Sequence, residues 1–292
     1  MKNIISIISI ILVATTSISA QQKEFPKFTG PYLGQKPPVK EPILFAPGIV
    51  STSNHSSVAI SPDGKELYWC RNEKIWFTKL ENGLWTEPEM IPFCKGDPYL
   101  YDNPFVTTDG KRMFFTSFRP GAVSMEKETI WYVERKISGW SDPIPVSTEI
   151  NAMPVHWSIS VSDSGTLYFD GGDICYSKLV NGLYKKPVKL GPEINTRYTE
   201  ICPYIAPDES YILFVRLYET PTNSGIYISY RDKSGKWLPP VFVLGGDPKT
   251  GGVSPRISPD GKYLFFANGS EGMWWMPAGF IEELRPKQLK NK

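Results

Sequence analysis

The sequence contains little histidine, little cysteine and no excess of charge of either sign. Its 292 residues include two histidines and four cysteines, and the cysteines form no CxxC pair, so they do not suit a zinc site. The formal net charge is only +2, which provides no basic bulk for nucleic acid. We therefore expect no metal, no cofactor and no nucleic-acid partner.

Long hydrophobic runs are also missing, except at the N-terminus. Residues 1–20 contain Lys2, an apolar stretch from Ile4 to Val13 and a small-residue site that ends at Ala20. This pattern predicts a signal peptide, with a membrane anchor as the alternative. No later apolar run is long enough to span a bilayer. We expect an exported protein, periplasmic or secreted, with no membrane span once the signal is removed.

Familiar catalytic motifs are absent as well. The sequence has no G-x-S-x-G elbow, H-E-x-x-H pair, Walker loop or EF-hand loop. Whether the protein is an enzyme therefore stays open, and a non-catalytic role is favoured. Export to an oxidising compartment would let cysteines pair. The thiols of Cys70, Cys94, Cys175 and Cys202 allow zero, one or two disulfides, or free buried cysteines.

Aromatic and turn-forming residues, in contrast, are abundant and repeat along the chain. A motif of an apolar strand, a tight turn and an aromatic strand recurs as VAISPDGKELYWC, FVTTDGKRMFFTS, ISVSDSGTLYFDG, YIAPDESYILFVR and RISPDGKYLFFAN. Asp-Gly between apolar runs is a strong hairpin signal. The turn aspartates, which we expect to be structural, are Asp63, Asp109, Asp163, Asp208 and Asp260.

A second turn motif follows the first in four of these units. It reads NGLWTEP, SGWSDP, NGLYKKP and SGKWLPP, and a proline then opens an extended segment. Each unit thus supplies four strands, named A to D in chain order. The fifth unit lacks strand D, and residues 41–51 at the other end of the chain have the spacing of a D strand without its own A, B and C.

Four-stranded units arranged in a ring are the β-propeller solution to exposed sheet edges. We therefore predict an all-β, five-bladed β-propeller of four-stranded antiparallel blades, closed by an N-terminal strand that completes the last blade. An open array of sheets is the alternative. The predicted domains are a signal peptide (1–20), a Pro-rich lead-in (21–40), the propeller (41–285) and a polar tail (286–292).

The repeats SPDGKELYW and SPDGKYLFF resemble the WD-like propeller repeat of the TolB type, seen in exported bacterial proteins. The segments MWWMPAGFIEELRP and PYLGQKPPVKEPILFAPG are similar to a single-domain, Bacteroidetes-type subgroup of such proteins. The resemblance covers all five units. It implies the fold and export, and it implies little about activity because propellers host binding and catalysis alike.

Ligands of propellers usually sit where the A strands begin, so we place the candidate site there. The candidate catalytic residues at this channel mouth, should the protein be an enzyme, are Asp102, Glu200, His55 and His156, with Asp170 or Asp173 as a third carboxylate. The candidate ligand-binding residues are Tyr101, Asn103, Trp157, Arg71, Arg119, Arg216 and Arg256. Arginines there favour carboxylate, phosphate or sulfate groups. Surface salt bridges are the structural alternative.

Two function classes remain open from these residues. The first is a binding or scaffold module that recognises an envelope protein, a peptide or a glycan, and we expect it to be a monomer. The second is a carbohydrate-active enzyme. A glycosidase would use a carboxylate pair such as Asp102 and Glu200. A lyase on acidic sugars would use His55 or His156 as the base.

Overall fold

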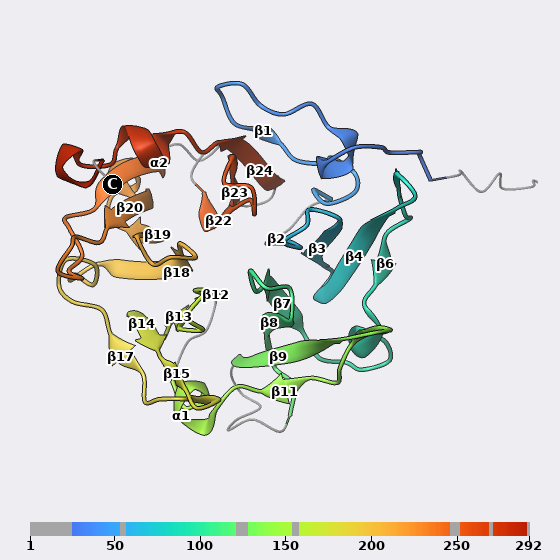
Figure 1. Cartoon of the computed structure of the whole chain (residues 1–292), viewed down its shortest axis with the longest axis horizontal. Helices are drawn as coiled ribbons and strands as arrows, with labels where there is room; N and C mark the ends of the chain where they lie inside the picture. The colour runs from blue at the N-terminus through green and yellow to red at the C-terminus, as the bar shows by residue number, and fades with distance from the viewer. Residues whose placement is uncertain are drawn as a thin grey trace, which may run out of the picture.

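The computed structural model describes residues 25–52, 57–120, 128–153, 158–245, 252–268 and 271–290. Within these residues, five small antiparallel sheets stand around a central axis as the blades of a propeller (Figure 1). The predicted five-bladed β-propeller is thereby confirmed. The first strand of each blade, such as β2, β12 and β22, lies nearest the axis in Figure 1.

The blades follow one another in chain order. Blade 1 contains β2 (Val58–Ile60), β3 (Glu66–Arg71), β4 (Lys74–Glu81), β5 (Leu84–Trp85) and β6 (Glu89–Met90). Blade 2 contains β7 (Tyr101–Val106), β8 (Arg112–Ser117), β9 (Thr129–Lys136), β10 (Gly139–Trp140) and β11 (Ile144–Pro145). Blade 3 contains β12 (Ile159–Val161), β13 (Leu167–Asp170), β14 (Ile174–Ser177) and β17 (Val188–Lys189), beside the hairpin of β15 (Leu179–Val180) and β16 (Leu183–Tyr184).

The last two blades are each a single four-stranded sheet. Blade 4 contains β18 (Thr199–Ile205), β19 (Tyr211–Leu217), β20 (Gly225–Tyr230) and β21 (Val241–Gly245). Blade 5 contains β22 (Val253–Ile257), β23 (Tyr263–Asn268), β24 (Gly272–Pro277) and β1 (Ile43–Leu44). Short helices connect or flank the strands: η1 (Tyr32–Gly34), η2 (Pro92–Cys94), α1 (Thr148–Asn151), η3 (Pro221–Asn223), α2 (Phe280–Glu283) and η4 (Lys287–Leu289).

Strand β1 closes the ring, as the spacing predicts. It pairs antiparallel with β24, in the register Ile43 to Trp275. The next residue after β1, Phe45, is fully buried, and its ring centroid lies 5.2 Å from that of Trp275. In Figure 1 the blue N-terminal strand lies beside the red C-terminal blade. The N-terminal segment is therefore an integral part of blade 5.

The Pro-rich lead-in is not merely an extended leader. The indole Nε1 of Trp85 donates to the carbonyl of Gly30 at 2.7 Å, which joins the lead-in to blade 1. The hydroxyl of Tyr32 donates to Asp260 at 3.0 Å, which joins it to blade 5. Leu33 is buried between these contacts. The lead-in therefore packs over the seam where the ring closes.

The turn aspartates behave as the hairpin signal predicts in four of the five units. Asp63 accepts hydrogen bonds from the Ser61 hydroxyl at 2.6 Å and from the Lys65 amide at 3.1 Å. Asp109 and Asp260 repeat both contacts, and Asp208 accepts from the amide two residues later. The turn of blade 3 differs, because the Gly165 amide closes it on the Ser162 carbonyl and Ser164 takes the position of the aspartate. The predicted turn residue there is thus displaced by one position.

When blade 3 is aligned on Ser164 instead of Asp163, the side chains that the innermost strands present to the channel form layers two residues apart. The first layer lies six residues before the turn residues Asp63, Asp109, Ser164, Asp208 and Asp260. It consists of Ser57, Asn103, Ser158, Cys202 and Ser254. The next layer consists of Ala59, Phe105, Ser160, Tyr204 and Arg256. Arg256 is the one charged residue in these two layers.

Two of the blade interfaces each contain a polar cluster of the same composition. Between blades 1 and 2, Arg135 donates to Glu66 and lies 3.9 Å from the ring centroid of Trp140. In blade 4, Arg231 donates to Glu209 at 2.6 Å and lies 4.4 Å from the ring centroid of Trp237, and Tyr168 of blade 3 contacts this pair. A buried tyrosine, Tyr68 or Tyr168, accepts from the arginine in each case. These clusters connect blades that share no strand.

Among the described residues, no helix has both the length and the apolarity to cross a bilayer. Within the same residues, no cluster of three histidine, cysteine or acidic side chains is arranged to hold a metal ion. All four cysteines are buried and unpaired. Burial is the main cause that raises the pKa of three of these thiols. The pKa is about 11 for Cys175 and about 12 for Cys94 and for Cys202. These thiols are therefore protonated near neutral pH.

Candidate functional site

A cavity of about 550 Å³ lies at the end of the channel where the innermost strands begin. The described residues that line it are Ser57, Asp102, Asn103, Phe118, Glu128, Ile201, Cys202, Val253, Ser254 and Ala267. They come from blades 1, 2, 4 and 5, so ring closure builds the cavity. Its volume lies within the range of small-molecule sites. We call it the mouth cavity.

Two carboxylates of blade 2 line the mouth cavity. Asp102 lies in β7, and Glu128 immediately precedes β9. Burial and, after it, the charge of Asp102 raise the pKa of Glu128 to about 7. Glu128 thus titrates near neutral pH beside a second acid, which is the environment that acid–base sites use. Asp102 was expected at the channel mouth, whereas Glu128 was not predicted as a site residue.

Backbone bulges shape the wall of the mouth cavity. Asn103, Cys202 and Ser254 have φ values of +52°, +56° and +54°, and each lies in a register shift of its strand. Residues other than glycine seldom adopt this left-handed conformation, and such strain is concentrated at binding and catalytic sites. A proline follows each of the three. An X-Pro pair, as Asn-Pro, Cys-Pro or Ser-Pro, therefore recurs at the bulge of three blades.

Ser57 contributes a polar group that the described residues leave unsatisfied. The residue is 3% exposed, and its hydroxyl oxygen has no hydrogen-bond partner in the described part of the chain. Buried polar groups are nearly always paired, so an exception in a cavity wall calls for an explanation. A ligand that enters the mouth cavity would supply the missing partner.

Arg256, expected at the mouth, instead lies inside the channel. Its guanidinium crosses from blade 5 to blade 3, where Nη2 donates to the Ser158 hydroxyl at 3.0 Å and to the Ile159 carbonyl at 2.9 Å. Burial lowers its pKa to about 10, so it stays charged at neutral pH. The prediction of a rim residue was wrong because Arg256 belongs to the second layer of the channel rather than the first.

The predicted carboxylate pair of Asp102 and Glu200 does not form. Glu200 is 1% exposed, and its Oε1 accepts from Nε of Arg216 at 2.7 Å. Thr196 adds two further donors to the same carboxylate. Neither Glu200 nor Arg216 lines the mouth cavity. Both were predicted as site residues because they fall near strand ends, but they neutralise each other inside blade 4.

The predicted aromatic platform Tyr101 is also internal. Its ring is fully buried, with its centroid 5.6 Å from that of Phe115. Arg119 donates to Asp97 at 3.0 Å and to the Tyr101 hydroxyl at 2.9 Å, so it belongs to the same cluster. Arg71 lies 5.1 Å from the ring centroid of Trp76. None of the three predicted residues lines the mouth cavity.

The remaining sequence candidates divide into two groups. His55, His156 and Trp157 lie outside the described residues, so their roles stay predictions. Asp170 is buried and accepts from the amides of Ser158 at 3.1 Å and Cys202 at 3.0 Å, which connects the inner strands of blades 3 and 4. Asp173 forms a surface pair with Lys189 at 2.6 Å.

Comparison with known proteins identifies a fold and no family. No family model and no curated protein matches the sequence. A TolB structure from Agrobacterium tumefaciens is 17% identical, over 74% of this chain and 69% of its own, with a TM-score of 0.50. A nidogen–laminin complex is 12% identical, over 74% of this chain and 75% of its own, with a TM-score of 0.52.

A third similar structure, TolB from Acinetobacter baumannii, is 17% identical, with a TM-score of 0.45. The match covers 78% of this chain and 54% of that one, so this chain spans about half of the other protein. The Bacteroidetes-type subgroup stays a prediction. Identities this low show the fold alone, and by fold the chain is a β-propeller similar to TolB-type and other propeller proteins.

Proposed function

We propose that this protein is an exported binding module whose mouth cavity recognises a polar group of a protein, peptide or glycan partner. The observation that carries the proposal is the unsatisfied Ser57 hydroxyl in the same cavity as Asp102 and Glu128. Together these groups offer hydrogen-bond donors and acceptors in a largely desolvated space, where such bonds discriminate strongly between ligands.

The size of the cavity limits what can enter it. About 550 Å³ accommodates one sugar ring or one to two amino-acid side chains, while the rest of a larger partner would lie on the surrounding face. Phe118, Ile201 and Val253 supply the apolar contacts that such sites combine with a few polar groups. One structure with a similar fold is a complex of nidogen with laminin, which is consistent with a protein partner.

Export of this module is also a proposal. It rests on the Lys2, Ile4–Val13 and Ala20 pattern of residues 1–20, which lie outside the described residues. A periplasmic or secreted location would give the cavity access to envelope proteins and glycans. Mass spectrometry of the protein recovered from the cell envelope would show a mature start near Gln21 if the leader is cleaved.

The binding proposal can be tested with a glycan array, a polysaccharide panel and a peptide library on the purified protein. Any ligand found is then titrated against Ser57→Ala and Asp102→Asn, which we expect to weaken binding at least about tenfold each. Asp173→Asn is the matched control, because this carboxylate lies outside the mouth cavity. If Ser57→Ala and Asp102→Asn bind the ligand as tightly as Asp173→Asn and the wild-type protein do, the mouth cavity is not the site.

The pKa of Glu128 supports a second candidate function, a glycoside hydrolase. A protonated Glu128 would serve as the general acid and an ionised Asp102 as its partner, which replaces the earlier Asp102–Glu200 pair. Product analysis on every glycan that binds decides between the two. Cleavage that Glu128→Gln abolishes would favour the enzyme, whereas binding without products in the wild-type protein would favour the module.

A further inference from the structure

A second cavity, separate in its lining from the first, occupies the opposite end of the channel. Its volume is about 330 Å³, and we call it the turn-side cavity because the turn residues Pro62, Pro207 and Pro259 line it. These three prolines are exposed, so the cavity opens to solvent between the turns. Every residue that lines it lies within the described part of the chain.

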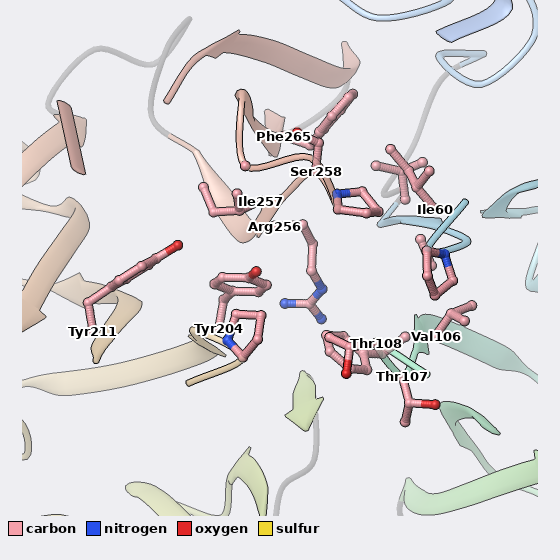
Figure 2. A pocket seen from close by; sticks show the side chains of 17 residues that line it. Ile60, Val106, Thr107, Thr108, Tyr204, Tyr211, Arg256, Ile257, Ser258 and Phe265 are labelled. Atoms are coloured by element: carbon pink, nitrogen blue, oxygen red, sulfur yellow. The ribbon is translucent and has the colours of Figure 1, made fainter. Parts of the chain in front are cut away.

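Most of the turn-side cavity is apolar. Phe105, Val106, Ile257 and Phe265 form its walls, and Tyr204 and Thr107 add hydroxyl groups. Figure 2 shows the Arg256 side chain in the middle of these residues, with its guanidinium between Tyr204 and Val106. A single cation therefore lies in an otherwise hydrophobic pocket.

The guanidinium of Arg256 is incompletely satisfied. Its Nη1 donates to the Pro255 carbonyl and its Nη2 to Ser158 and Ile159, but the buried Nε has no partner among the residues that the structure describes. Among the described residues no carboxylate lies within ion-pair distance of it, and the charges of Asp170 and Asp102 favour its charged form from farther away. Arg256 is only 4% exposed. A buried cation whose direct hydrogen-bond partners are neutral oxygens is costly for a protein to keep.

We propose that the turn-side cavity binds an apolar monocarboxylate, with the carboxylate on the Nε–H side of Arg256 and the hydrocarbon part against Phe105, Val106 and Phe265. A carboxylate supplies an acceptor for Nε and a negative charge in direct contact with the guanidinium, and charge-assisted bonds to arginine are among the stronger hydrogen bonds in proteins. The same ligand class covers a free aryl or aliphatic acid and the C-terminal residue of a hydrophobic peptide.

The lining favours a monocarboxylate over phosphate or sulfate. A phosphate group needs several donors, whereas the described lining offers one arginine and a few hydroxyl groups among apolar walls. Neither Asp102 nor Glu128 lines this cavity, so the site does not depend on the function proposed for the mouth. The two proposals can therefore fail separately.

The test uses phenylacetate and its neutral isostere, phenylacetamide, in calorimetric titrations of the full chain at constant ionic strength. We expect phenylacetate to bind at least about tenfold more tightly than the amide, as a lost charge-assisted bond predicts. Inorganic phosphate should not compete. Equal affinity for the acid and the amide, or no phenylacetate binding at its highest soluble concentration, would overturn the proposal.

Variants locate the binding to Arg256. Arg256→Met should abolish the preference for phenylacetate, and Arg71→Met, which removes a guanidinium that lines neither cavity, should leave it intact. If Arg256→Met does not fold, Ala59→Leu keeps the arginine and fills apolar space in the same cavity. Phenylacetate affinity that is unchanged in both Arg256→Met and Ala59→Leu would rule the cavity out. If only one of the two variants folds, unchanged affinity in that variant has the same meaning.

Discussion

Charged residues near the channel differ in whether an opposite charge faces them. Glu200 and Arg216 form a complete buried ion pair and are therefore structural. Arg256 is held by neutral oxygens, and Glu128 is an acid whose pKa lies near neutral. Arg256 and Glu128, whose burial is not fully compensated, line the two cavities, where a ligand can compensate it.

The Glu200–Arg216 pair yields a prediction about stability. Glu200→Gln or Arg216→Met should each destabilise the fold by about 3–5 kcal/mol, because each leaves a buried charge without a partner. The double variant should be less destabilised than the sum of the two. Urea denaturation measures both. The control is Lys189→Met, which breaks the exposed pair with Asp173 and should destabilise the fold far less.

Glu128 yields a prediction about pH. The folded-state pKa is raised from 4.5 to about 7, so the native state holds this proton more tightly than the unfolded state does. Native stability contributed by the protonated acid is therefore present below about pH 4.5 and is lost as the pH rises to about 7. The melting temperature of Glu128→Gln, measured relative to that of wild type, should therefore rise as the pH increases from 5 to 8. A difference that does not change with pH would contradict this.

At the scale of strands and blades, neighbouring blades are joined by side chains rather than by backbone ladders. The clusters around Arg135 and Arg231 have the same composition, in which an arginine lies over a tryptophan and donates to a glutamate and a tyrosine. Burial disfavours ionisation of Glu209, but hydrogen bonds led by that from Arg231 outweigh it and lower its pKa to about 2. The repeated unit therefore includes its interface as well as its hairpins.

These clusters predict equal effects at two distant interfaces. Arg135→Met and Arg231→Met should each destabilise the propeller by about 1–3 kcal/mol, since each removes a cation–π contact and hydrogen bonds to a partly buried glutamate. The two effects should add, because the clusters share no residue. Thermal or urea unfolding of the single and double variants is the measurement. An effect at only one interface would show that the clusters are not equivalent.

At the scale of the whole molecule, stability depends on closure of the ring. Strand β1, the buried Phe45 and the packed lead-in together cover the edge of blade 5 and its seam with blade 1. Without them β24 would present an unpaired edge, and Trp275 would lose a covering layer. The N-terminal segment and the C-terminal blade therefore stabilise each other, although they are far apart in the sequence.

Deletion of residues 21–51 tests the closure. We expect the truncated chain to lose cooperative unfolding and to aggregate, because the exposed β24 edge can pair with other chains. A peptide that spans residues 25–52, added in trans, should restore a cooperative transition. Circular dichroism during heating and size-exclusion chromatography report on both. A truncated chain that is folded and monomeric would contradict the closing role of β1.

Much of the fold could be predicted from the residues because it depends on local chemistry. The sequence Ser-Pro-Asp-Gly predicts the turn at Asp63, because the hydrogen bonds that form this turn join groups only a few residues apart. In blade 3 the variant Ser-Asp-Ser-Gly displaces the alignment by one residue and places Ser158 in the channel layer. One such displacement changes which side chain faces the channel.

The sequence by itself determined the number of blades, their four-stranded pattern and the closing role of residues 41–51, because turn chemistry and strand periodicity act over short distances. Only the tertiary structure decided which polar groups meet. Arg256 reaches Ser158, 98 positions away, whereas Glu200 is neutralised by Arg216 in the adjacent strand of its own blade. Pairing, burial and bulges depend on how the closed ring brings strands together, and no local pattern encodes that geometry.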